Sequence, residues 1–138
     1  MEMKRMSFFD MKPFDPGEGR TREYKMFAVT VTKHTVNINT KLHVAMGEPK
    51  YVEVAFNEFG IKPVAQETKY SIKLTSHSTH HKWNAISRTA VPEKIEELLP
   101  FGRESNNLII SDGQFDEESG YWIFDIDSGL IVKRVKRK

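Results

Sequence analysis

The chain has 138 residues, of which 38% are hydrophobic and 29% charged, and none is cysteine. A chain of this length buries about two thirds of the surface of its unfolded state, so it needs no cross-link to fold, and the lack of cysteine excludes a disulfide framework and a thiolate zinc site. No stretch approaches the roughly 20 apolar residues of a membrane-spanning helix, and the first residues, MEMKRMSFFDMKP, include no apolar run of signal-peptide length. We therefore expect a cytoplasmic protein that contacts no membrane.

The net charge of +2 conceals an uneven distribution of charged residues. Residues 70–132 contain ten acidic and five basic side chains, whereas the last six residues, KRVKRK, contain five basic ones. A nucleic-acid-binding domain normally presents a basic face on its folded body. In this sequence only the tail, residues 133–138, is strongly basic, and it suits either a contact with nucleic acid or acidic protein, or a solubilising end.

Residues 1–25 mix methionine, aromatic residues, proline, glycine and both signs of charge without a strand or helix period, which predicts an irregular N-terminal arm. The arm contains Phe8, Phe9 and Phe14. Burial of each phenylalanine is worth about 1.5 to 3 kcal/mol, so these side chains are costly to leave in water. We expect the arm to dock either on its own domain or on a partner.

Two short strands open the next segment. Phe27, Val29 and Val31 alternate with smaller and polar residues, as in a half-buried strand, and β-branched content supports the assignment. Val36 and Ile38 then share one face of a second strand.

A helix and a hairpin complete this segment. The stretch TKLHVAMG, residues 40–47, predicts a short helix, because Leu42 and Met46 lie four residues apart on one face and Gly47 suits a left-handed cap. After a turn at Glu48-Pro49, alternation through residues 52–56 predicts a strand, and a turn at 57–60 leads to a returning strand at 61–64. The order over residues 26–69 is β-β-α-β-β.

Residues 70–132 show the same order of elements. Tyr70, Ile72 and Leu74 alternate along a strand, and residues 83–86 form a second one. The stretch VPEKIEELLPFG, residues 91–102, predicts a helix with Pro92 in its first turn and Pro100 at its end. NLIISD and YWIFDI, residues 107–112 and 121–126, then predict a hairpin of two strands around a turn-rich GQFDEESG.

We therefore predict an α+β fold, mainly β, in which residues 26–132 form a single domain. Its two pseudo-repeats are residues 26–69 and 70–132, preceded by the arm and followed by the basic tail. A period of about fifty residues indicates internal duplication, although an ordinary α+β domain with recurring elements remains the alternative.

The first unit resembles the swapped-hairpin domains of AbrB-type transition-state regulators and MazE-type antitoxins. Their pattern is a strand, then Gly-Arg-Val-hydrophobic-Ile-Pro, a short helix ending in Leu-Gly, another strand and a hairpin closing in Gly-Ile. Here VNIN at residues 36–39 stands in the place of Val-hydrophobic-Ile-Pro, Leu42 and Met46-Gly47 follow in register, and Gly60-Ile61 closes the hairpin. In that family two chains interlock to form one barrel-like core and a DNA-binding face. The resemblance implies that the two units in this chain form an intramolecular pseudo-dimer. The size of a unit leads to the same expectation, because some forty residues cannot bury a core alone.

The sequence departs from the family at the arginines that carry its DNA contacts, because Thr35 and the pair His43-Val44 occupy those positions. Other basic side chains are the candidates for contacts with nucleic acid: Lys33, His34, Lys41, Lys50, Arg88, Lys133, Arg134, Lys136, Arg137 and Lys138. Since phosphate contacts are roughly additive, the few candidates on the domain itself predict weak binding at physiological salt.

Candidate metal and catalytic residues form no recognised motif. His77, His80 and His81 have spacings that can bind a divalent metal on a helix, but they lie in a polar loop without an acidic ligand, which favours a solvated loop. Six acidic residues do not match the spacing of a calcium loop and are expected to coat one end of the second hairpin: Asp112, Asp116, Glu117, Glu118, Asp125 and Asp127. No phosphate loop, nucleophile elbow or dinucleotide-binding pattern is present, so we expect neither an enzyme nor a cofactor.

Two functions remain in competition, and we place the first slightly ahead. One is a DNA-binding transcription regulator of the AbrB-like type, a monomer or homodimer. The other is a small phage or mobile-element protein that binds and inhibits a host protein such as a CRISPR-type defence nuclease, through an aromatic arm and an acidic ridge. The residues of this second site are Phe8, Phe9, Phe14, Glu93, Glu96, Glu97, Asp116, Glu117 and Glu118. A small-ligand-binding role is a third hypothesis.

Overall fold

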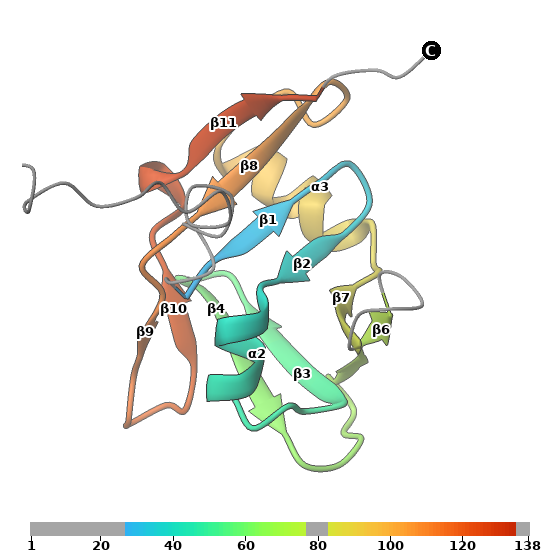
Figure 1. Ribbon diagram of the computed structural model, residues 1–138, viewed down its shortest axis with the longest axis vertical. Coiled ribbons are helices and arrows are strands. Elements are labelled where there is room, and N and C mark those ends of the chain that lie inside the picture. The colour runs from blue at the N-terminus through green and yellow to red at the C-terminus, as the bar shows by residue number, and fades with distance from the viewer. Residues whose placement is uncertain (1–26, 77–82, 135–138) are drawn as a thin grey trace, which may run out of the picture.

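The computed structural model describes residues 27–76 and 83–134 (Figure 1). The predicted N-terminal arm, the three histidines of the loop and the last three cations lie outside the described residues: Phe8, Phe9, Phe14, His77, His80, His81, Lys136, Arg137 and Lys138. Within the described residues, no helix has the length and apolar character needed to cross a membrane.

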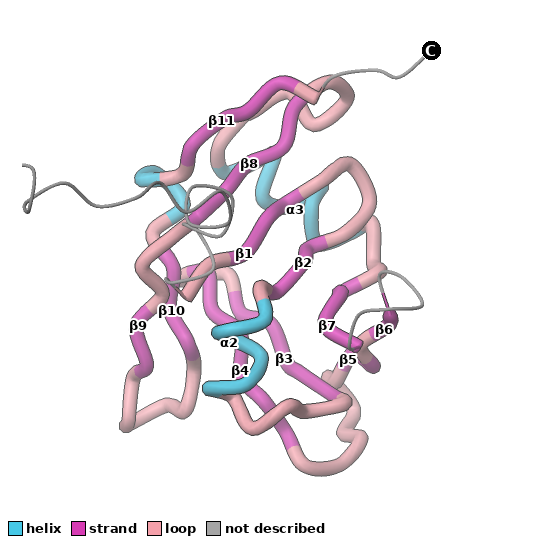
Figure 2. Tube along the Cα trace, in the orientation of Figure 1, coloured by secondary structure: helices cyan, strands magenta, loops and turns pink. Residues whose placement is uncertain are grey.

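The fold is α+β and mostly β, as predicted, and its described strands form two antiparallel sheets. The six-stranded sheet has the order β11 (Leu130–Lys133), β8 (Asn106–Ile110), β1 (Val29–Val31), β2 (Val36–Ile38), β7 (Trp83–Ile86) and β6 (Thr75–Ser76). The five-stranded sheet has the order β5 (Ile72–Lys73), β3 (Tyr51–Ala55), β4 (Phe59–Val64), β10 (Trp122–Phe124) and β9 (Gln114–Phe115). The helices are α2 (Thr40–Ala45), α3 (Ala90–Leu98) and the 3₁₀ helix η3 (Ile126–Ser128). In Figure 2, β11, β8, β1 and β2 run side by side in the upper half and β3, β4, β10 and β9 occupy the lower half.

Helix α2 forms as the sequence predicts. The side chain of Asn39 accepts a hydrogen bond from the backbone N–H of Leu42 at 2.9 Å, which caps the first turn. Leu42 and Met46 are both buried, and Gly47 ends the helix with φ of 89°, a conformation that favours glycine. His43, which follows Leu42, is also buried, and its Nε2–H donates to the carbonyl of Pro49 at 3.1 Å.

Helix α3 likewise begins and ends near its prolines. Pro92 lies in the first turn, where backbone N–H groups have no acceptor within the helix, so the N–H that proline lacks costs no hydrogen bond. Leu99 is the C-cap residue and precedes Pro100. Val91 and Ile95 face the core, whereas Leu98 is 48% exposed. Leu42, Met46 and Ile95 belong to one apolar core that draws on both sheets.

The two halves of the domain pair strand by strand. β1 pairs with β8, β2 with β7, β3 with β5 and β4 with β10, and each ladder is antiparallel. In these ladders Val29 lies opposite Ile110, and Trp122 opposite Ile61. The sheets are therefore built from residues of 26–69 and 70–132 together.

The strand predicted over residues 70–76 is wrong as a single element. Tyr70 is 70% exposed and lies outside any strand. The chain forms β5 in one sheet and β6 in the other, and between them Leu74 is buried while its N–H donates to the carbonyl of Lys50 at 2.8 Å. Leu74 fills the core at the point where the chain passes from one sheet to the other.

The predicted hairpin of residues 107–112 and 121–126 is also wrong. β8 and β10 belong to different sheets, because the chain bends at residues 111–113 and Asp112 adopts a positive φ of 61°. β10 instead pairs with β9, a strand inside the stretch expected to be a turn. A further strand, β11, extends the six-stranded sheet and includes Lys133, the first residue of the expected tail.

Candidate functional site

A hollow of about 690 Å³ opens between the β3–β4 turn, β9, β10, η3 and the end of α3, and we name it the acidic groove. Five carboxylates line it: Glu58, Asp112, Asp116, Asp125 and Asp127. No lysine or arginine is among the described residues that line it. The groove is therefore surrounded by negative charge from four separate chain segments.

The floor and walls of the acidic groove are aromatic and aliphatic. The rings of Phe59 and Phe124 are buried with their centroids 5.9 Å apart, and Phe56 stacks on Phe59 at 5.8 Å. Leu98 and Phe115 line the groove while remaining 48% and 49% exposed. A ligand in the groove would therefore contact apolar side chains and carboxylates at the same time.

The bend between β8 and β9 brings Asp112 to the groove. Asp112 takes a left-handed conformation that aspartate tolerates better than most residues. Gly113 follows, and its N–H donates to the carbonyl of Phe27 at 2.9 Å. A Cβ atom at Gly113 would overlap the ring of Phe124, so glycine allows the bend to lie directly against the floor of the groove.

Two further carboxylates are oriented by their own turns. Oδ2 of Asp116 accepts hydrogen bonds from the hydroxyl of Ser119 at 2.6 Å and from its N–H at 3.2 Å. Oδ1 of Asp125 accepts from the N–H of Asp127 at 3.1 Å and caps η3. These bonds fix the directions of the side chains at the rim before any partner arrives.

The described residues contain no group of three or more His, Cys, Asp or Glu side chains placed to hold a metal ion. The carboxylates of the acidic groove thus surround an apolar floor without converging on one point. Such an arrangement suits a cationic ligand with several spaced charges and apolar stems between them.

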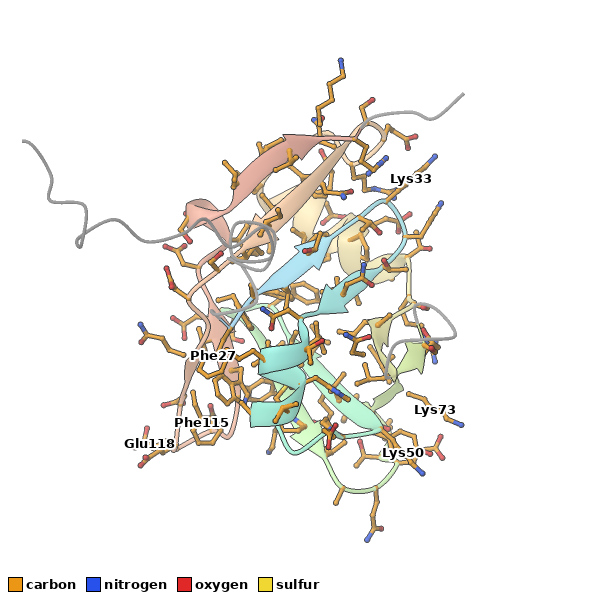
Figure 3. All side chains as sticks on the ribbon, in the orientation of Figure 1. Phe27, Lys33, Lys50, Lys73, Phe115 and Glu118 are labelled. Atoms are coloured by element: carbon orange, nitrogen blue, oxygen red, sulfur yellow. The ribbon has the colours of Figure 1, made fainter. Side chains whose placement is uncertain are left out.

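The acidic ridge predicted from the sequence is divided in the structure. Asp116 lines the acidic groove, and Glu117 and Glu118 are exposed in the β9–β10 turn beside it (Figure 3). The glutamates of α3 contact Arg103 or Lys94 instead. Glu93 accepts from the Arg103 guanidinium at 3.3 Å and Glu96 from the Arg103 N–H at 2.9 Å. Glu97 lies 3.8 Å from Lys94 on the same helix.

Half of the predicted nucleic-acid contacts gather at one end of the six-stranded sheet, which we name the basic end. It comprises Lys33, His34, Arg88, Arg103, Lys133 and Arg134. His34 Nδ1 lies 3.3 Å from the hydroxyl of Thr89, the neighbour of Arg88. The Arg103 guanidinium donates to the carbonyl of Lys33 and so joins the β1–β2 turn to the loop before β8.

Arg134 holds the end of β11 in place. Its guanidinium donates to the carbonyls of Asn106, Arg103 and Glu104 at 2.8, 2.9 and 2.7 Å, and to the Asn107 side chain at 2.8 Å. Four such bonds from one planar fork indicate a structural role. The sequence offered no sign of this role, since Arg134 lies within a run of basic residues.

Lys33 forms an ion pair with Glu104 at 2.8 Å. The hydrogen bond from Lys33, followed by its positive charge, holds the pKa of the exposed Glu104 carboxyl below its ordinary value of 4.5. The charge of Lys33 is therefore partly neutralised within the basic end.

Lys41 and Lys50, also predicted to contact nucleic acid, lie away from the basic end. The Lys41 ammonium is 5.5 Å from the centre of the Phe27 ring, which packs edge-on against Trp122 at 4.9 Å. Lys50 is exposed, and Figure 3 places it at the opposite end of the molecule from Lys33. The structure thus does not assemble all the predicted cations on one face.

Sequence reasoning identified the acidic residues of the second hairpin but missed Glu58, Leu98 and Phe115. Glu58 comes from the β3–β4 turn and Leu98 from α3, so only the tertiary fold places them beside the hairpin. In the sequence, only the apolar Leu98 after Glu96 and Glu97 could have indicated an exposed contact residue at the end of this helix. No family model, curated protein or solved structure matches the chain.

Proposed function

We propose that the protein is a non-enzymatic binding module whose acidic groove holds a basic segment of a partner protein. The observation that carries the proposal is a hollow with five carboxylates, no lining cation among the described residues and two half-exposed apolar walls. Of the acidic ridge predicted from the sequence, the proposal keeps Asp116, which lines the groove, and leaves out the glutamates of α3.

A segment rich in arginine fits both the carboxylates and the apolar walls of the acidic groove. Its guanidinium groups form bidentate hydrogen bonds with carboxylates, and its alkyl stems and planar heads pack on aromatic rings. Leu98 and Phe115 supply apolar area at the walls, on which the alkyl stems of the segment can pack. The exposed carboxylates act chiefly on the rate of encounter and on specificity.

The charge pattern suggests which class of basic partner to expect. Spaced carboxylates around a groove offer the negative field that phosphates offer along a nucleic acid. A protein that binds nucleic acid through a basic segment is therefore a natural target, and occupation of that segment would inhibit it. This is the role proposed from the sequence for an inhibitor of a defence nuclease.

A titration with a fluorescent arginine-rich peptide tests the proposal. Asp112→Asn with Asp127→Asn removes two groove charges, and Glu67→Gln with Glu104→Gln removes two exposed charges elsewhere, as a matched control. We expect the first variant to bind about tenfold more weakly, a change of about 1.4 kcal/mol, and the second to bind as the unmodified protein does. Equal weakening in both variants would show that net charge alone attracts the peptide.

A specific observation also supports a second function, binding of nucleic acid at the basic end. Lys33, Arg88 and Lys133 come from three separate segments and gather there. Duplex DNA titrated at several salt concentrations measures the number of phosphate contacts from the slope. Lys33→Ala, Arg88→Ala and Lys133→Ala together are expected to lower the slope, whereas Lys50→Ala, Lys69→Ala and Lys94→Ala together are not. Failure to bind DNA at low salt excludes this second function and leaves the groove proposal intact.

We further propose that residues 26–69 and 70–132 are duplicated swapped-hairpin units of the AbrB/MazE type, interlocked as a pseudo-dimer within one chain. The exchange of strands supports the proposal when β5 and β6 are counted as one interrupted strand and the added strands β9 and β11 are left out. The first strand of each unit then pairs with the third of the other, in β1·β8 and β5·β3. The second strands pair with each other, as do the fourth, in β2·β7 and β4·β10. Reciprocal pairing of this kind is what a two-fold axis between two copies produces.

A further inference from the structure

Strand β11 ends the six-stranded sheet and presents apolar side chains to solvent. Leu130, Ile131 and Val132 are 63%, 47% and 39% exposed. Natural edge strands are usually protected by proline, by bulges or by charges along the strand, but β11 has only Lys133 at its end. Figure 1 shows β11 along the margin of the molecule.

The direction of the backbone shows which residues of β11 have their amides on the outer edge. The N–H of Arg134 donates to the carbonyl of Ser105 at 2.9 Å, across the ladder with β8. Since bonding direction alternates along an antiparallel strand, Val132 and Leu130 also point their amides toward β8. The N–H and C=O groups of Ile131 and Lys133 therefore point away from the sheet.

We propose that β11 pairs with β11 of a second copy of the chain, antiparallel and centred on Val132. Residues whose N–H and C=O groups point away from the sheet must lie opposite each other in such a pair. Ile131 of each copy therefore lies opposite Lys133 of the other, and these two residue pairs form four backbone hydrogen bonds. The two Val132 side chains then meet in the closely spaced type of pair. Val132 and Leu130 share a face with Ile109 and Asn107, so the pairing joins two exposed apolar patches into one.

Charge complementarity identifies the partner strand as a second copy in antiparallel orientation. Asp125 and Asp127 precede β11, whereas Lys133 and Arg134 end it, and the sequence continues with three more cations. An antiparallel copy brings the acidic start of each strand toward the basic end of the other, while a parallel copy would place like charges together. Each β11 therefore has an acidic start and a basic end, and in an antiparallel pair each of these lies near the opposite charge of the other copy.

Sedimentation of the full chain over a range of concentrations tests the proposal through two variants and one control. Val132→Lys places two ammonium groups face to face, and Val44→Lys adds the same charge at an exposed valine of α2 as the matched control. Ile131→Pro removes an outward N–H, which an edge strand tolerates, together with a side chain that is 47% exposed. We expect a dimer whose dissociation constant rises at least about tenfold in both β11 variants and stays unchanged in Val44→Lys.

Three results would overturn this interface: a monomer at every concentration, a dimer unaffected by Val132→Lys, or equal weakening by Val44→Lys. If Ile131→Pro lowers the circular dichroism signal of the folded state, Val132→Lys decides alone. Peptide binding to the acidic groove is measured on the same variants and is expected to be unchanged, so that failure of the dimer and failure of the groove proposal are distinguishable.

Discussion

Gly113 lies so close to Phe124 that a Cβ atom on it would overlap the ring. Phe124 is buried in the floor of the acidic groove, and Gly113 follows the bend that separates β8 from β9. The absence of a side chain at one residue therefore determines how closely the bend approaches the core.

Gly113→Ala is expected to lower the free energy of unfolding by about 3 kcal/mol, because a buried ring and a sheet ladder must both shift. Gly47→Ala serves as a control, since its added Cβ meets nothing within 4 Å and only its φ of 89° is unfavourable. That variant should lose about 1 to 2 kcal/mol. Urea denaturation measures both values, and equal losses would mean that the ring moves aside freely.

Arg134→Lys keeps the charge of the basic end but loses the planar fork that bonds to three carbonyls and an amide. We expect the free energy of unfolding of this variant to be about 1 to 2 kcal/mol lower, because four partly buried or exposed acceptors lose a donor. Lys133→Ala, at the exposed neighbouring position, should change stability by less than about 0.5 kcal/mol. Thermal denaturation of both variants checks the prediction, and a neutral Arg134→Lys would return Arg134 to the list of candidate phosphate contacts.

The Lys33–Glu104 pair predicts a pH dependence of stability. The folded pKa of Glu104 lies below its ordinary value of 4.5, so the pair stabilises the fold above that pH and its contribution is lost as the pH falls through the folded pKa. Glu104→Gln should therefore differ most from the unmodified protein at neutral pH and converge with it in acid. On a Lys33→Ala background the same substitution should show little pH dependence, and a persistent difference there would point to another cause.

Cutting the chain in the exposed loop of residues 65–70 tests the interlocked arrangement. Each half contributes strands to both sheets, so neither fragment alone can form the core, and we expect both to be unfolded when separate. Mixing them should restore the circular dichroism spectrum of the intact chain. A fragment that folds by itself contradicts the pseudo-dimer.

Local patterns were sufficient to predict most of the fold. The alternation of Val29 with Val31 and the spacing of Leu42 with Met46 correctly predicted β1 and α2. β9 has only two residues, both exposed, and β11 has four exposed residues in a row, so neither shows the alternation that reveals a strand. The acidic groove was predictable only in part, because Glu58 and Leu98 reach the hairpin residues through tertiary contacts rather than through the sequence.

The strand ladder that sets Val29 opposite Ile110 has a consequence for synthesis of the protein. β1 leaves the ribosome long before β8 exists, and β2, β3 and β4 also await partners from the second half. Closing such distant pairs makes folding slow, because loop entropy is lost before contacts form. Until the second half is synthesised, the nascent first half therefore has apolar surface and strand edges without partners, and such surfaces favour aggregation.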